Sequence, residues 1–180
     1  MSVTPPPAPS PESLAAAARL GMPPLPTDLP TGPPDGQGWR HFITPPGFVE
    51  HNGPLWFRRD EQSMVMGLRV DARHVNPMGN LHGGMMATFA DMLLPIAANS
   101  QGPLKGRFLP TVSLQIDFLA GVRLGAWIEG RAQVLRVTRS MVFMQGLVGV
   151  DGEPVARVSG VFKIGPEFKP RPPAPNAEPA

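Results

Sequence analysis

One acidic residue stands alone in a long apolar part of the sequence. Asp91 is the only Asp, Glu, Lys or Arg between Arg73 and Lys105, and its neighbours include Phe89 and Leu93. Burying a carboxylate costs several kcal/mol unless it is paired or protonated, so residues placed in this way are often functional. A half-exposed position or a buried partner would explain the same placement. Asp91 is therefore a candidate functional carboxylate.

The residues His82, Gly83 and Gly84 open the apolar run that contains Asp91. Two glycines at the start of a helix leave backbone N–H groups uncovered, and helix N-termini attract oxyanions and polarised carbonyls. A carbonyl oxygen that gains negative charge in a transition state would suit this position. Close packing of a helix on a sheet would also explain the two glycines.

Nine residues separate His82 from Asp91. On one helix these two side chains point to opposite faces, about 13.5 Å apart along the axis. A single carbonyl group therefore cannot reach the Gly83 N–H and the Asp91 carboxylate of the same helix. A two-fold dimer with antiparallel helices would bring the helix start of one subunit to Asp91 of the other. The spacing thus predicts composite sites in a homodimer, or in a dimer of dimers.

The elements that must position these residues follow from hydrophobic patterning. Residues 82–99 are rich in Ala, Met and Leu and predict a helix, which Pro95 should bend or end. Two short strands are expected at 55–59 and 64–70, and four more at 111–119, 126–137, 141–150 and 155–164. Joined by short turns, the last four predict an antiparallel meander. The expected fold is α+β, a curved antiparallel sheet wrapped around a long central helix.

Proline marks the ends of the chain. Of the 25 prolines, most lie in residues 1–46 and 166–180. We expect a largely unstructured Pro-rich N-terminal lead at 1–46, a single domain at 47–165 and a Pro-rich C-terminal tail at 166–180. Within the lead, residues 13–20 could form a short helix. Trp39, Phe42 and Phe48 are apolar enough to anchor its end to the domain.

Composition excludes several classes of function. The sequence has no cysteine, so disulfides, thiolate metal sites and a cysteine nucleophile are excluded. A net charge of +2 is too mild for a dedicated nucleic-acid binder. Neither a signal peptide nor an apolar run long enough to span a bilayer is visible. We expect a cytoplasmic protein with no nucleic-acid or membrane partner.

The stretch HVNPMGNLHGGMMATFAD, from His74 to Asp91, resembles the motif of hotdog-fold acyl-CoA thioesterases. The shared pattern is Asn, then Pro or Ala, a Gly-containing spacer, His-Gly-Gly, and an acidic residue nine positions after the His. It is most similar to the PaaI-like and human-type branch of the thioesterase superfamily. GPLWF at 53–57 and PTVSLQIDF at 110–118 are similar to the family's flanking strands, so the resemblance covers about 47–165.

The resemblance implies hydrolysis of an acyl-CoA thioester to free acid and CoA, with no metal or cofactor. Asp91 would be the general base or the nucleophile. The Gly83 N–H would polarise the thioester carbonyl, and His82 would orient that carbonyl or the helix start. Asn76 would position the water or the substrate. Ser113 falls where some relatives place a serine that assists the water.

The same resemblance suggests how CoA would be held. CoA is rich in phosphate, so Lys or Arg should line the entrance. Arg136, Arg139 and Ser140 lie at the turn where the family tends to hold the CoA nucleotide, and Gly84 is a further substrate-binding candidate. By contrast, His74 is expected to be a surface loop residue rather than a catalytic one.

Two other functions remain open from the sequence. One is a non-catalytic protein that binds or senses acyl-CoA on the same fold. The other is a hotdog dehydratase, which the position of the acid after His-Gly-Gly disfavours.

Several apolar residues could line an acyl pocket, although core packing explains them better: Met85, Met86, Phe89, Met141 and Met144. The acyl group itself is not encoded in any visible motif.

Overall fold

The structure is a computed structural model that describes residues 10–19, 21, 29–30, 32–34, 37–60, 64–100 and 102–167. The rest of the N-terminal lead and nearly all of the expected tail at 166–180 lie outside the described residues. The three α-helices of the described part are α1 (Pro11–Arg19), α2 (Phe48–His51) and α3 (Gly83–Asn99). Two 3₁₀ turns, η1 (Ala72–His74) and η2 (Gly102–Leu104), lie on either side of α3 along the chain. The architecture is α+β, as predicted.

One antiparallel sheet contains all seven strands, in the order β1-β2-β3-β5-β6-β7-β4. The strands are β1 (Arg40–His41), β2 (Leu55–Arg59), β3 (Met64–Arg69), β4 (Thr111–Phe118), β5 (Trp127–Val137), β6 (Met141–Val150) and β7 (Glu153–Lys163). Asp151 and Gly152 have positive φ angles of 50° and 88° and form the two-residue turn between β6 and β7. The six long strands thus lie close to their predicted positions.

The predicted four-strand meander is wrong in one respect. β5, β6 and β7 form a meander, but β4 pairs with β7 and not with its sequence neighbour β5. The segment between β4 and β5 is longer than a hairpin turn, so the chain can leave one edge of the meander and enter at the other. Alternation within a strand does not encode this choice of partner. As a result β4 is an edge strand.

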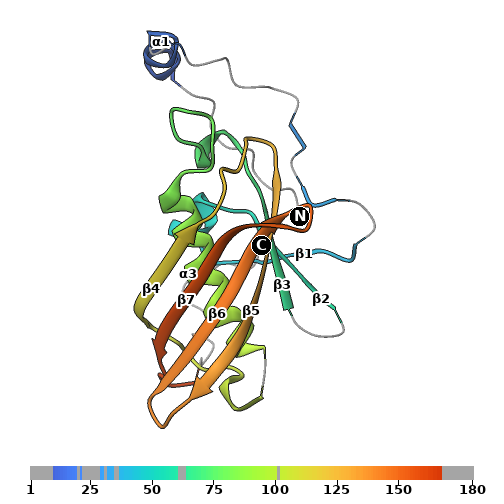
Figure 1. Ribbon diagram of the computed structural model, residues 1–180, viewed down its shortest axis with the longest axis vertical. Helices are drawn as coiled ribbons and strands as arrows, with labels where there is room; N and C mark the ends of the chain where they lie inside the picture. Colours follow the sequence, from blue (N-terminus) through green and yellow to red (C-terminus); the bar gives the residue numbers. More distant parts are fainter. Residues whose placement is uncertain are drawn as a thin grey trace, which may run out of the picture.

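Helix α3 lies against one face of the curved sheet, as Figure 1 shows. Its residues Phe89, Leu93 and Leu94 are fully buried. A Cβ atom at Gly130 of β5 would lie only 2.6 Å from Leu93 Cδ2, so helix and strand approach each other closely. The helix continues through Pro95 to Asn99. These contacts confirm the central helix that the apolar sequence predicts.

The end of the N-terminal lead packs on the sheet. The ring of Trp39 meets that of Trp127 edge-on at 5.0 Å, and Phe42 meets Phe57 at 6.2 Å. Strand β1 pairs with β2, so the sheet begins ahead of residue 47, where we expect the domain to start. Phe48 does not act as an anchor, since 67% of it is exposed.

Helix α1 forms where the sequence predicts a short helix, but it buries none of its residues and stands away from the sheet (Figure 1). Within the described residues, no helix is long and apolar enough to cross a membrane.

Candidate active site

The start of α3 is capped by a histidine. His82 is the N-cap residue, and its Nδ1 accepts a hydrogen bond of 2.9 Å from the Gly84 N–H. The neutral ring therefore carries its proton on Nε2. Since His82 is exposed, this N–H can be offered to a ligand. A backbone hydrogen bond also closes the loop that precedes the cap: the His82 N–H donates to the His74 carbonyl at 2.7 Å.

Gly83 has the N–H group that remains open at this helix start. The Gly84 N–H is used by His82, whereas no described residue accepts a hydrogen bond from the Gly83 N–H. A Cβ atom at Gly83 would lie 3.3 Å from Phe118 Cζ, which is closer than ordinary van der Waals contact. Glycine thus fits beside the Phe118 ring and leaves a donor that a carbonyl oxygen can approach.

Asn76 shapes the loop that leads to the helix. Its Oδ1 accepts hydrogen bonds from the backbone N–H groups of Met78 at 2.9 Å and Asn80 at 3.3 Å. The Asn76 N–H donates to the Asn80 carbonyl at 2.7 Å. The side-chain oxygen is therefore committed to the turn, an arrangement typical of Asn in loops. A direct role toward water or substrate would fall to its amide nitrogen.

Asp91 is half-buried on α3 and has a hydroxyl partner on β4. Thr111 Oγ1 donates a hydrogen bond of 2.6 Å to Asp91 Oδ1. The length is typical of a charge-assisted O–H···O⁻ bond. This bond fixes one oxygen of the carboxylate and thereby the orientation of the group. The sequence reasoning missed Thr111, although it lies two residues from the serine that was proposed for a similar task.

A β-bulge decides which of the two hydroxyls faces the helix. Thr111 pairs with the fully buried Phe162, while Ser113 pairs with the next residue, Val161, because the register shifts between Thr111 and Ser113. Paired residues share a face of the sheet and successive residues alternate. Thr111 therefore faces Asp91, and the structure places Ser113 on the outer face. Without the bulge both residues would have shared one face.

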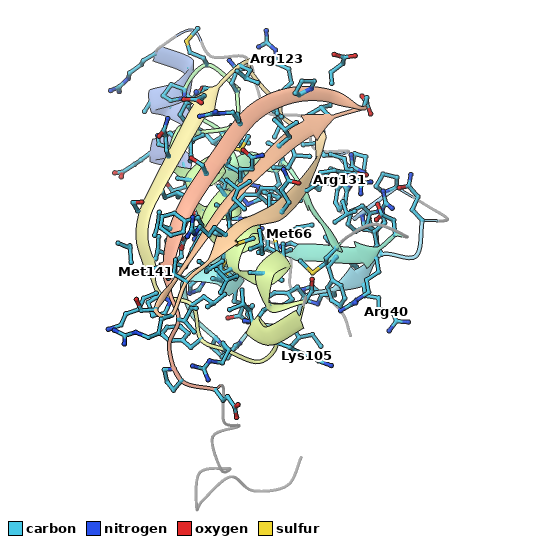
Figure 2. The ribbon with its side chains drawn as sticks, turned by 60° about the horizontal axis from the view of Figure 1, so that its bottom comes forward. Arg40, Met66, Lys105, Arg123, Arg131 and Met141 are labelled. Atoms are coloured by element: carbon cyan, nitrogen blue, oxygen red, sulfur yellow. The ribbon has the colours of Figure 1, made fainter. Side chains whose placement is uncertain are left out.

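The candidate residues form two groups at opposite ends of the sheet. Asn80, in the loop before His82, forms an isolated antiparallel bridge with Arg123, which lies four residues before β5. Thr111, in contrast, is joined through Phe162 and Val142 to the turn between β5 and β6. Figure 2 shows Arg123 and Met141 toward opposite ends of the sheet, with Met66 inside the molecule. One subunit thus keeps the helix start apart from Asp91.

The residues proposed to hold CoA lie with the second group. A second bulge lies in β5, between Val134 and Arg136. After it, Arg136 pairs with Phe143 and lies on the outer face of the sheet. Arg139 and Ser140 form the exposed turn between β5 and β6, and the Ser140 carbonyl accepts the Ile164 N–H at 2.8 Å. The structure therefore brings these three residues to the same end of the sheet as Thr111 and Asp91.

His74 differs from its prediction. It is fully buried, so its assignment as a surface loop residue is wrong. Burial lowers the pKa of its imidazole; Asp71 opposes this effect, and Arg73 adds to it. Polar residues in a turn-rich sequence look like surface residues, and only the packing of the loop against the residues after α2 buries this one.

Most of the residues named for an acyl pocket belong to the core. Met85, Met86, Phe89 and Met144 are buried in the main hydrophobic cluster, in agreement with the preferred interpretation. A hollow of about 1180 Å³ lies on the outer face of the sheet and is lined by residues such as Trp127, Arg131 and Leu147. It includes neither Asp91 nor His82.

The sequence is similar to those of known proteins. The sequence profile of the thioesterase superfamily matches residues 78–154. The chain is 36% identical over 130 residues to a Pseudomonas aeruginosa protein named "Putative esterase PA0474", which covers 71% of this chain and 96% of that protein. It is 24% identical over 82 residues to the mouse protein named acyl-coenzyme A thioesterase 13, which covers 46% of this chain and 57% of that protein.

Solved structures share the fold. Zebra fish thioesterase superfamily member 2 superimposes with a TM-score of 0.59 and 26% identity, over 67% of this chain and 88% of that one. The TT0310 protein of Thermus thermophilus gives a TM-score of 0.57 and 27% identity, over 68% of this chain and 99% of that one.

Proposed function

The chain belongs to the thioesterase superfamily, with its hotdog fold and its hydrolysis of thioesters, and we propose that its substrate is an acyl-CoA. The observation that carries the proposal is the open N–H of Gly83 at the start of a 17-residue helix. A donor at a helix N-terminus can stabilise the oxyanion of a tetrahedral intermediate. The name of the mouse relative supports acyl-CoA as the substrate class.

The helix start would polarise the thioester. The carbonyl oxygen would accept a hydrogen bond from the Gly83 N–H, and the Nε2–H of His82 would provide a second donor. Both donors are aligned before the substrate arrives, because the Gly84 N–H holds the His82 ring. Such preorganised donors act mainly in the transition state, where the carbonyl oxygen gains negative charge.

The Asp91 carboxylate would begin the attack on the thioester carbon. As a general base it would take a proton from water while the water oxygen forms the new C–O bond. The C–S bond then breaks, and the proton returns to the departing thiolate of CoA. As a nucleophile, an Asp91 oxygen would bond to the carbonyl carbon while the C–S bond breaks and CoA leaves as its thiolate. Water would then hydrolyse the resulting anhydride to the free acid and the Asp91 carboxylate, and the proton that this releases would go to the thiolate. In both cases Thr111 keeps one carboxylate oxygen in place.

The sites would form between two subunits. β4 is the last strand in the sheet, and Val112, Phe118 and Leu119 on or beside it are more than half exposed. An uncovered edge strand with apolar side chains is suited to pairing with its own copy. Antiparallel pairing of two β4 strands would bring the helix start of one subunit to the Asp91 end of the other, together with the turn that contains Arg139.

A paired substitution at Gly83 tests the polarising donor. Proline is tolerated as the first residue of a helix, and His82 already has the extended conformation (φ −66°, ψ 137°) that a following proline requires. Gly83→Pro therefore removes the N–H and little else. Gly83→Ala is the matched control, because it brings a similar Cβ to Phe118 but keeps the donor.

We expect thiol release from acyl-CoA to fall about a hundredfold in Gly83→Pro, and far less in Gly83→Ala. Asp91→Asn should fold normally and lose most of its turnover. Equal activity of the two Gly83 variants would contradict the role of the donor. Tight binding of acyl-CoA without turnover by the wild type, across short, medium and aromatic acyl chains, would favour a sensor instead.

Mixed dimers test the composite site. Refolding Gly83→Pro together with Asp91→Asn yields hybrid dimers in which one site combines an intact Gly83 and an intact Asp91. Half of the dimers are hybrids with one restored site in two, so about a quarter of wild-type activity should return. No recovery from a mixture that exchanges subunits would place both residues in one subunit's site.

A further inference from the structure

His74 is the one buried polar or charged residue in the described part of the chain. It lies in η1, eight residues before His82, and neither the proposed attack nor the binding of CoA uses it. A buried polar side chain must be hydrogen-bonded to be tolerated, so its partners show what it holds together.

Both ring nitrogens of His74 are occupied by backbone groups. Nδ1 accepts the Asp71 N–H at 3.1 Å, and Nε2 lies 3.1 Å from the Asn52 carbonyl. An acceptor at Nδ1 and a donor at Nε2 define the neutral tautomer with its proton on Nε2. The ring thus joins the segment after α2 to the start of η1.

The main chain of His74 reaches the helix start directly. Its carbonyl accepts the N–H of His82, the N-cap residue of α3, at 2.7 Å. The next pair along, Val75 and Leu81, forms an antiparallel bridge. The His74 ring therefore anchors the loop segment that begins at His74. This segment sets the position of the His82 cap, and with it the direction of the Gly83 N–H.

Neighbouring charges reinforce the same anchor. Arg73 donates to the His51 carbonyl at 2.7 Å and the Gly53 carbonyl at 2.6 Å, and it forms an ion pair of 2.7 Å with Asp71. The segment after α2 is thus fixed by Arg73 and by the His74 ring. Of these two residues, only His74 is also bonded to the helix cap.

We infer that His74 is a positioning residue for catalysis: its buried ring fixes the loop that aims the N-terminus of α3 at the substrate carbonyl. Its catalytic importance rests on the proposed thioester hydrolysis, whereas its effect on the helix start does not. Misplacing a catalytic donor by about 1 Å can reduce the rate about a hundredfold. The effect should appear in kcat, because the donors act in the transition state.

The test compares three variants of the full chain. His74→Phe keeps a ring but makes neither hydrogen bond, and His74→Gln offers an amide N–H in place of Nε2. Val65 is a fully buried residue of β3 that pairs with Arg58 and Arg131. The variant Val65→Ala removes side-chain volume there and so controls for a general loss of stability. Each variant is assayed for kcat and KM with acyl-CoA, and for amide hydrogen exchange over residues 82–86 by mass spectrometry.

We expect His74→Phe to exchange faster at 82–86 and to lose about tenfold or more in kcat with little change in KM. His74→Gln should recover part of both effects, and Val65→Ala should show neither. Unchanged exchange in His74→Phe, or a kcat no lower than that of Val65→Ala, would overturn the inference. If the wild type hydrolyses no thioester, the proposed function fails, and the exchange data alone then decide whether His74 orders the helix start.

Discussion

Replacing Thr111 by valine removes the hydroxyl that binds Asp91 and keeps the shape of the side chain. Hydrogen bonds to charged groups contribute about 1.5–3 kcal/mol. Within a single subunit Asp91 is only half-buried and Thr111 is exposed, so water can replace part of the hydrogen bond. We therefore take the lower end of this energy range. A loss of about 1.5 kcal/mol in transition-state stabilisation corresponds to about a tenfold fall in kcat.

The assay is thiol release from acyl-CoA at saturating substrate, with Thr111→Ser and Ser113→Ala as matched variants. Thr111→Ser keeps the donor and should stay close to wild type. Ser113→Ala should also stay close, because the bulge in β4 turns Ser113 to the outer face. A normal kcat for Thr111→Val, with an inactive Asp91→Asn, would refute the reasoning that the hydroxyl orients the carboxylate. A large loss in Ser113→Ala would refute the assignment of the two faces.

Three further substitutions test other parts of the structure. In Gly84→Ala the new Cβ would lie 3.0 Å from His82 Nδ1, so the ring must move. We expect a lower kcat for this variant. Its melting temperature should change little, because the gain in helix propensity of about 1 kcal/mol offsets the weakened cap. Gly130→Ala should lower the free energy of unfolding by about 1–3 kcal/mol in urea titrations, because its Cβ would overlap Leu93; an unchanged midpoint would contradict the close approach of α3 and β5. Burial lowers the pKa of His74 in the folded chain below its ordinary value of 6.5. Below about pH 6.5 the unfolded chain therefore binds a proton that the folded chain does not, so the free energy of unfolding should decrease as the pH is lowered, until the pH reaches the lowered pKa. Urea titrations of His74→Phe between about pH 7 and pH 5 should show a shallower dependence, and an identical slope would count against a neutral buried ring.

Local patterns were sufficient for much of the fold. The length of the apolar run after His82 and its content of Ala, Met and Leu predicted α3. The burial of α3 followed as well, because a helix with almost no polar face must be covered. Asp151 and Gly152 are residue types that favour a two-residue hairpin turn, and both adopt the positive φ that the turn between β6 and β7 requires. Neither pattern indicated that β4 would pair with β7, because partner choice depends on how distant strands pack around the helix.

The sequence by itself determined the two ends of the chemistry, the His82-Gly83-Gly84 helix start and the isolated Asp91, and their spacing on one helix. These are local properties, set by residue type and by the geometry of a helix. Only the tertiary structure decided that Thr111 binds Asp91, and that His74 is buried and bonded through its carbonyl to the helix cap. A single bulge in β4 reverses which side chains face inward, and burial of a loop depends on segments far away in the chain; neither leaves a periodic signal in the sequence.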